Sequence, residues 1–143
     1  MKFIILGSGS SMGVPRADGF FGNCNPNNSK NYRTRCSALI KGKDKNILID
    51  TSPDLRSQML KNKIVNIDTV LYTHNHADQT HGINDLRVFS LKNKKKIPIF
   101  ADHNTKKYLL NSFSYCFKKL KDYPTTLKIF DLKKKLYMNK FIK

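Results

Sequence analysis

Glutamate and tryptophan are both absent from the 143 residues of this chain. All ten acidic residues are aspartates, so any carboxylate that binds a cation, accepts a proton or orients another side chain must belong to an aspartate. Cysteine is scarce as well, with only Cys24, Cys36 and Cys116. Because three is an odd number and no export signal is evident, we expect no disulfide framework.

Long apolar runs are missing too. No segment approaches the roughly 20 apolar residues that a membrane-spanning helix requires. The apolar stretch at residues 3–6 is too short for the core of a signal peptide. We therefore expect a cytoplasmic protein without membrane contacts. The 39% of hydrophobic residues are enough for the core of one small domain.

Negative charge is scarce, since 27 basic residues face only 10 acidic ones and the formal net charge is +17. Such an excess raises the question of nucleic-acid binding. However, the lysines are spread over many short runs and do not alternate with aromatic residues. We interpret the charge mainly as a solvated surface that attracts anionic substrates, and nucleic-acid binding is the alternative that this pattern does not favour.

Apolar segments bounded by turn residues predict several strands, and helices are predicted between them. The strands are expected at residues 3–6, 37–41, 46–49, 69–72, 97–100 and 127–132. Ser52 and Pro53 predict a helix start, with Leu55, Met59 and Leu60 facing inward. A short helix is expected at residues 83–90, and helical spacing of apolar residues predicts a further helix at residues 105–120.

This alternation of strands and helices predicts an α/β layered fold. We expect one domain over residues 1–132. Residues 133–143 form a basic tail without a clear period and are a candidate for disorder.

Potential metal-binding side chains are concentrated in residues 73–82, whose sequence is THNHADQTHG. Three of the four histidines of the chain and an aspartate lie within eight positions. Imidazole and carboxylate are good ligands for zinc and similar divalent ions. After a buried strand, His74 and His76 can turn toward one point and Asp78 toward a second. The alternative is a polar loop whose histidines cap turns, but the clustering favours a site for one or two metal ions.

The same segment resembles the HxHxDH signature of the metallo-β-lactamase superfamily. Upstream and downstream segments at residues 6–11, 13–16, 31–37, 47–51 and 82–87 are similar to the PhnP-like branch of cyclic-phosphate phosphodiesterases. The likeness extends over residues 3–101. It implies an αββα sandwich, of which this chain would carry the N-terminal half. It also implies hydrolysis of phosphodiesters with zinc or manganese, up to two ions.

Specific roles follow from the resemblance. His74 and His76 match ligands of the first metal, and Asp78 matches a catalytic ligand of the second. Asp50 matches an aspartate behind the site that orients a histidine, although it could instead cap the following helix. The second-metal histidine of the family is Gln79 here, and His81 is an alternative ligand.

The family takes further metal ligands from its C-terminal half, whereas only His103 follows His81 in this chain. Asp102 and His103 form a weaker candidate pair. We therefore expect a truncated chain, whose half-sandwich leaves an apolar sheet face uncovered.

The predicted function is that of a metal-dependent hydrolase, which cleaves a small cyclic or nucleotide-like phosphodiester through a metal-bound hydroxide. The alternatives are an endonuclease of the tRNA 3′-processing type and a truncated fragment without activity. The sequence leaves open whether the chain forms a homo-oligomer. Arg33 and Arg35 are equally compatible with binding substrate phosphate and with a surface role.

Overall fold

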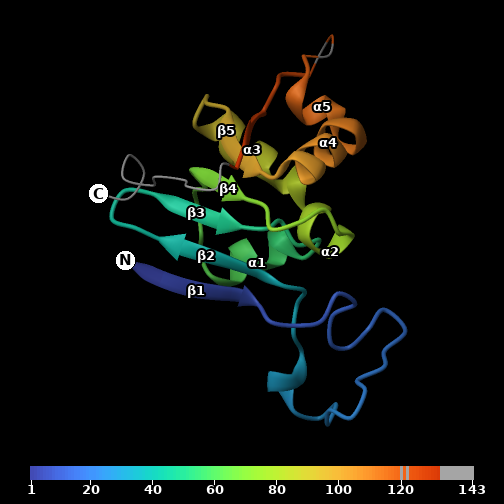
Figure 1. The fold of residues 1–143 in the computed structure, drawn as a ribbon. Coiled ribbons are helices and arrows are strands. Elements are labelled where there is room, and N and C mark those ends of the chain that lie inside the picture. Colours follow the sequence, from blue (N-terminus) through green and yellow to red (C-terminus); the bar gives the residue numbers. More distant parts are fainter. Residues whose placement is uncertain (120, 122, 133–143) are drawn as a thin grey trace.

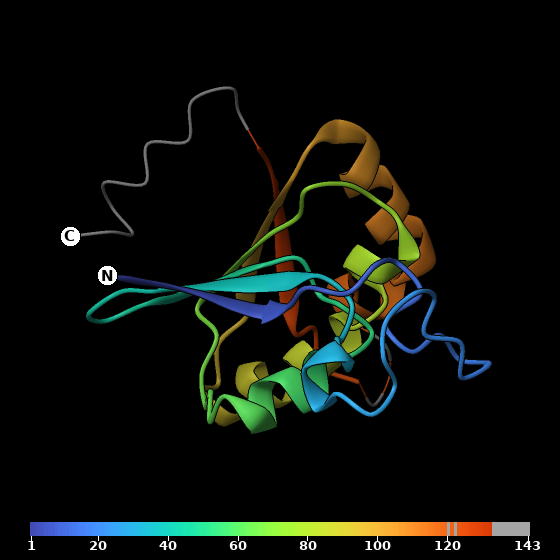
Figure 2. The ribbon, with the colours of Figure 1, turned by 90° about the horizontal axis from the view of Figure 1, so that it is seen from below.

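The computed structural model describes residues 1–119, 121 and 123–132, which form one six-stranded sheet with helices packed on it (Figure 1, and from below in Figure 2). The predicted tail at residues 133–143 lies outside the described residues. The strands are ordered in space as in the sequence: β1 Lys2–Gly7, β2 Ser37–Lys41, β3 Asn46–Ile49, β4 Thr69–Leu71, β5 Ile97–Ala101 and β6 Leu127–Asp131. Every predicted strand is present.

The connections explain the direction of each strand. A tight turn, in which the Gly42 N–H donates to the carbonyl of Lys45 at 2.8 Å, makes β2 and β3 antiparallel. From β3 onward the strands are parallel and are joined through helices, as parallel pairing requires. The connecting helices are α1 Leu55–Lys61, α2 Ala77–Thr80, α3 Leu86–Lys92, α4 His103–Ser112 and α5 Ser114–Phe117. The mixed α/β class is thus confirmed.

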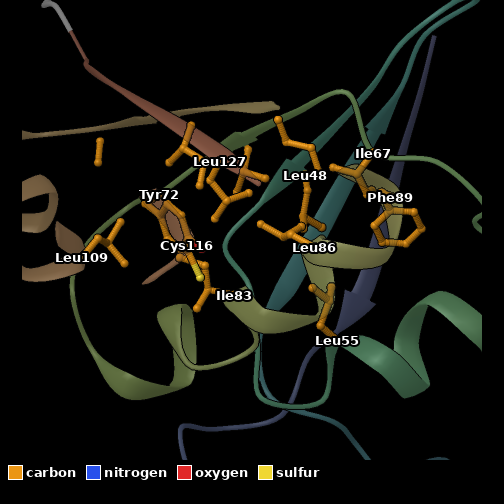
Figure 3. Close-up of a cluster of buried hydrophobic side chains, with 14 of the residues drawn as sticks. Leu48, Leu55, Ile67, Tyr72, Ile83, Leu86, Phe89, Leu109, Cys116 and Leu127 are labelled. Atoms are coloured by element: carbon orange, nitrogen blue, oxygen red, sulfur yellow. The ribbon is translucent and has the colours of Figure 1, made fainter. Parts of the chain in front are cut away.

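One face of the sheet carries the hydrophobic core. Leu39, Leu48, Val70 and Ile99 are partners in register on successive strands, and all four are fully buried. They pack in one cluster with side chains from helices (Figure 3), among them Leu55, Leu86 and Leu109. Each such side chain contributes about 1.5–3 kcal/mol by leaving water. The core therefore fixes the helices against this face.

The opposite face also carries an apolar row, but none of its members is buried. The row crosses all six strands in register and consists of Ile5, Ala38, Ile49, Leu71, Phe100 and Phe130. The rings of Phe100 and Phe130 stack at 5.3 Å between centroids. The described helices contribute their buried side chains to the core on the other face. The apolar face expected from the sequence is present, but it is not fully uncovered, because Ile47 on the same face of β3 is buried.

Helix α1 begins two residues later than predicted. The hydroxyl of Ser52 accepts a hydrogen bond from the N–H of Asp54 at 3.1 Å, which forms a turn ahead of the helix. Asp54 is the N-cap residue. Leu60 is 64% exposed, so its predicted inward orientation is wrong. It lies five residues after Leu55, which places it roughly 140° away around the helix axis.

The predicted helix at residues 105–120 is divided at Phe113, where φ is −125° and ψ is 37°. Its first part, α4, is capped by Asp102, whose carboxylate accepts from the N–H of Thr105 at 2.7 Å. That carboxylate therefore serves the helix cap. The predicted helix at residues 83–90 is a 3-10 turn, Ile83–Asp85, followed by α3. None of the helices in the described chain is long and apolar enough to cross a membrane.

Candidate metal centre

The histidine-rich segment follows β4, at the carboxyl ends of the parallel strands, where open α/β sheets usually bind ligands. It was expected to be a loop, but it contains the short helix α2 (Figure 1). His76 is the N-cap residue, and its carbonyl accepts hydrogen bonds from the N–H of Thr80 at 3.1 Å and from the hydroxyl of Thr80 at 2.8 Å. The turn thus fixes the backbone directly after the first two histidines.

His74 and His76 lie against each other. Nε2 of His74 is 3.1 Å from Nδ1 of His76, and the two rings meet edge to face at 4.5 Å between centroids. Two imidazole nitrogens that bind one tetrahedral zinc ion at about 2.0–2.1 Å stand about 3.3 Å apart. The two nitrogens therefore already have nearly the spacing that one cation requires.

A hydrogen-bonded chain fixes the ring of His74 from behind. The carboxylate of Asp50 accepts from the N–H of Thr73 at 2.8 Å and from its hydroxyl at 2.7 Å. The hydroxyl oxygen of Thr73 lies 2.9 Å from Nδ1 of His74. Because the hydroxyl proton is directed to Asp50, Nδ1 of His74 must donate to this oxygen. In a neutral ring Nε2 then carries the free lone pair, which is the state that a metal ligand needs.

Thr73 was not singled out by the sequence, because a hydroxyl beside a histidine has no distinctive spacing. The resemblance assigned the orienting role to Asp50, and the structure places Thr73 between Asp50 and the ring. The alternative for Asp50, a helix cap, is not observed, since the N-cap position of α1 is Asp54 and the carboxylate of Asp50 accepts from Thr73.

Asp50 itself has an unusual environment at the end of β3. Its φ is 58°, in the left-handed region that aspartate tolerates better than most residues. Its N–H donates to the carbonyl of Leu71 at 2.9 Å, which fastens the loop to β4. Burial raises the pKa of the Asp50 carboxyl, although the bonds from Thr73 act in the opposite direction.

Asp78 and Gln79 form a second polar unit on α2. Nε2 of Gln79 donates to the carboxylate of Asp78 at 2.8 Å. The side chain of Gln79 is buried, and its amide oxygen has no hydrogen-bond partner among the described residues. A buried oxygen without a partner is costly, and this one stands at the position of the second-metal histidine of the family.

His81 is directed elsewhere. Its Nε2 lies 3.2 Å from the hydroxyl of Tyr108, and its ring packs edge to face on Phe113 at 5.6 Å. Within the described ranges, no three histidine, cysteine or aspartate side chains converge on a common point. The structure therefore brings together only the His74–His76 pair. The ligand roles of Asp78 and His81 stay predictions.

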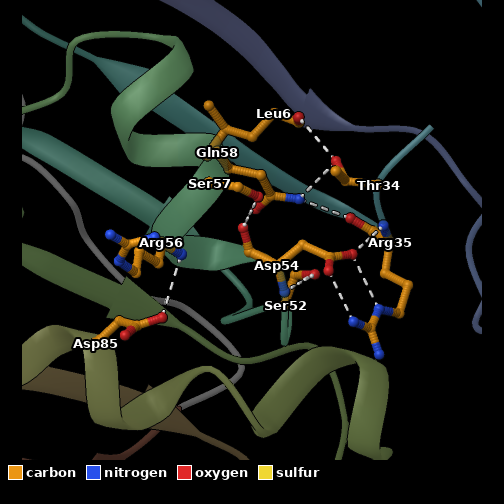
Figure 4. A network of polar contacts seen from close by, with 9 residues as sticks. All are labelled: Leu6, Thr34, Arg35, Ser52, Asp54, Arg56, Ser57, Gln58 and Asp85. Carbon is orange, nitrogen blue, oxygen red and sulfur yellow. Dashed lines mark hydrogen bonds and ion pairs between the residues drawn. The ribbon is translucent and has the colours of Figure 1, made fainter. Parts of the chain in front are cut away.

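Arg35 is occupied by an ion pair. Its guanidinium donates to both carboxylate oxygens of Asp54, at 2.9 and 2.7 Å, and its backbone N–H donates to the same carboxylate (Figure 4). This pairing holds the pKa of Asp54 below its usual range. Arg35 thus fastens the segment before β2 to the start of α1. Arg33, in contrast, donates to the hydroxyl of Ser8 at 3.0 Å.

Comparisons with known proteins agree with this architecture. Residues 45–140 match the beta-lactamase superfamily domain. A diphosphatase from the PhnP family has a similar structure, with a TM-score of 0.80 and 31% identity over 93% of this chain and 50% of the other. An octanoyltransferase of Porphyromonas gingivalis (strain ATCC BAA-308 / W83) is 38% identical over 136 residues, which are 93% of this chain and 27% of that protein.

More distant structures share the fold. Zinc-bound PqqB from Methylobacterium extorquens has a TM-score of 0.68 and 20% identity, over 93% of this chain and 50% of the other. The short form of human tRNase Z has a TM-score of 0.59 and 17% identity, over 93% and 52%. The chain spans about half of these structures, including the diphosphatase, and carries a part of their common fold. It belongs to the metallo-β-lactamase superfamily, as a PhnP-like member.

Proposed function

We propose that this chain provides the metal-binding loop of a metal-dependent hydrolase that cleaves a small phosphodiester. The observation that carries the proposal is the 3.1 Å approach of Nε2 of His74 to Nδ1 of His76. A divalent cation bound there would polarise the substrate phosphate and lower the pKa of a coordinated water. Two ligands leave positions open for Asp78, water, substrate oxygens or groups outside this sequence.

The residues of this chain would prepare the site before any cation arrives. The bond from Nδ1 of His74 to Thr73 fixes the tautomer in which Nε2 binds the metal. The buried carboxylate of Asp50 accepts a hydrogen bond from the hydroxyl of Thr73, which directs the lone pair of that oxygen to the ring. Such support behind the ligands typically changes metal affinity 10–100-fold.

For a second cation we propose Asp78 together with the amide oxygen of Gln79. That oxygen is buried without a partner in the described chain, so a cation would relieve its desolvation cost. His81 instead contacts Tyr108 and Phe113, both outside the metal-binding loop. Because an amide oxygen is a poorer zinc ligand than imidazole, the second ion would be held more weakly than the first.

The proposed substrate class rests on similarity and on charge. The PhnP-family protein at 31% identity is described as a diphosphatase, which makes a diphosphate bond the second candidate substrate. The formal charge of +17 would favour either anion. The likeness to tRNase Z, at 17% identity, supports the fold alone. The octanoyltransferase matches over only 27% of its length, so acyl transfer does not follow from it.

Metal binding provides the first test. Calorimetric titration of the metal-free protein with zinc and with manganese should show one tightly bound ion. His74→Ala and His76→Ala should each remove this ion, whereas the matched control His103→Ala, at the start of α4, should bind as the original chain does. Equal losses in all three variants, or no bound ion in the unmodified chain, would contradict the proposal.

Hydrolysis provides the second test. Bis(p-nitrophenyl) phosphate and a nucleoside diphosphate sugar should be compared at saturating zinc or manganese. Cleavage of the first, lost in His76→Ala, supports a phosphodiesterase. Cleavage of the second alone would favour the diphosphate bond. Processing of a precursor tRNA, with neither small substrate cleaved, would instead support the endonuclease.

A further inference from the structure

A cavity of about 800 Å³ lies beside the free edge of β1, away from the metal-binding loop. Three segments distant in sequence surround it: residues 5–8, the 3-10 helix Ser29–Asn31 with residues 32–34, and residues 57–61 of α1. None of residues 73–82 lines it. The volume is within the range of about 300–1,000 Å³ that small-molecule sites occupy.

The polar lining of this cavity carries one sign of charge. Lys30, Arg33 and Lys61 line it, and no aspartate does. In the described part of the chain, none of the three forms an ion pair with a carboxylate. Arg33 is one of only five arginines, so this residue is a more specific feature than a surface lysine. Like charges around one cavity repel one another, and a bound anion would relieve that repulsion.

Arg33 is also held in place. Its Nη1 donates to Ser8, and its backbone N–H and carbonyl pair with Val14 at 2.8 and 3.0 Å. One hydrogen bond occupies Nη1, and the other guanidinium nitrogens have no partner within the described ranges. Arginine positioned in this way suits phosphate oxygens, which it can bind through two parallel hydrogen bonds.

The floor of the cavity is rigid, because Gln58 of α1 fastens two walls together (Figure 4). Its Nε2 donates to the hydroxyl of Thr34 at 3.0 Å and to the carbonyl of Arg35 at 2.8 Å. The Arg35–Asp54 pair joins the same two segments. The cations are therefore presented by a preformed frame, which lowers the ordering cost of binding.

Besides these polar groups, the lining has an apolar and aromatic part. Leu6 contributes to it, and so does Tyr32, which is 58% exposed and held edge to face by Phe21 at 5.0 Å. An exposed, positioned aromatic ring offers a surface on which a nucleobase can stack. The cavity thus combines cations for a phosphate with an aromatic wall for a ring.

We propose that this cavity is a second ligand site, which binds a nucleoside monophosphate or an organic phosphate of that size. The phosphate lies against Arg33, Lys30 and Lys61, and the base lies against Tyr32. The site is separate from the His74–His76 pair and does not depend on a metal.

The test uses the full chain and adenosine 5′-monophosphate as the probe. Binding is measured by calorimetry and mapped by amide chemical shifts. The double variant Lys30→Gln, Lys61→Gln is compared with Lys43→Gln, Lys107→Gln, which removes the same two charges from exposed positions outside the cavity. We expect roughly tenfold weaker binding in the first variant and none of this loss in the control. We also expect shifts at residues 29–34 and 57–61.

Three results would overturn the proposal. Equal weakening in both double variants would show attraction by net charge alone. Shifts confined to residues 73–82 would place the nucleotide at the metal-binding loop. Binding of single-stranded RNA without binding of the mononucleotide would indicate a polynucleotide surface. Since none of these measurements uses hydrolysis, the result is independent of the proposed activity.

Discussion

Thr73 carries the connection between a buried carboxylate and a metal-binding ring, although it offers neither charge nor imidazole. Its hydroxyl donates to Asp50 and accepts from His74, so one small side chain sets the tautomer of the ring. Replacing it would leave the carboxylate and both histidines present but disconnected. The contribution of positioning can thus be separated from that of ligation.

The variant Thr73→Val removes the hydroxyl while keeping the shape of the side chain. We expect zinc affinity to fall about 10–100-fold, because His74 loses the bond that holds its proton on Nδ1. Thr73→Ser keeps the hydroxyl and should restore most of the affinity. Calorimetric titration with zinc measures both variants. Identical zinc affinities of Thr73→Val and Thr73→Ser would show that the hydroxyl link does not influence metal binding.

Gln79 and His81 offer competing positions for a second ligand. With saturating zinc, His81→Ala should keep the weaker second ion, whereas Gln79→Leu should lose it and keep the first. The reason is the unpartnered amide oxygen of Gln79 beside Asp78. The measurement is the number of zinc ions bound per chain, determined by atomic emission after dialysis against graded zinc concentrations. Loss of the second ion in His81→Ala alone would reverse the assignment.

At the scale of elements, Gly82 allows the end of α2 to pack against the loop before α1. Its N–H donates to the carbonyl of Thr51 at 3.0 Å, and a Cβ added to it would lie 2.0 Å from the carbonyl oxygen of Ser52. Gly82→Ala should therefore lower the free energy of unfolding by about 1–3 kcal/mol. Gly42→Ala, where the nearest atom is 3.1 Å away, should cost less in the same urea titration. Equal losses would disprove the close approach.

The Arg35–Asp54 pair joins the segment before β2 to α1 and should make stability depend on pH. Because the folded pKa of Asp54 is lowered, the contribution is complete above about pH 4, the unfolded value. It is lost as pH falls through the lower folded pKa. Asp54→Asn should lower the free energy of unfolding by about 1 kcal/mol at pH 7.

This difference should shrink toward pH 2. Urea titrations of both proteins across that range provide the measurement. A difference that stays constant from pH 7 to pH 2 would mean that the lost contribution is not the ionised pair.

At the scale of the whole molecule, the apolar row across the six strands dominates the sheet face that lies opposite the core and the described helices. Phe3 and Ile5 on β1 belong to this face and are 63% and 66% exposed. Exposed apolar patches of this kind promote association. The double variant Phe3→Lys, Ile5→Lys should therefore reduce self-association in sedimentation velocity. The free energy of unfolding should change by only about 0.5 kcal/mol per site, as is usual at exposed positions.

The matched control for this prediction is Val65→Lys, Val88→Lys, at positions 67% and 60% exposed that lie outside the apolar row. It adds the same charge and should leave self-association unchanged. If both double variants reduce association equally, then charge rather than the sheet face is responsible.

The sequence alone determined the six strands and the concentration of metal-ligand chemistry at residues 74–81. Both are local: a strand is encoded by a short apolar run, and imidazole keeps its affinity for cations wherever the chain places it.

Only the tertiary structure decided which polar groups meet. Asp50 reaches Thr73 across 23 positions, Arg35 reaches Asp54 across 19, and His81 reaches Tyr108 across 27. These contacts depend on strand register and on how each helix packs on the sheet. No residue spacing within a single segment encodes them, because the side chains are brought together only when the core closes.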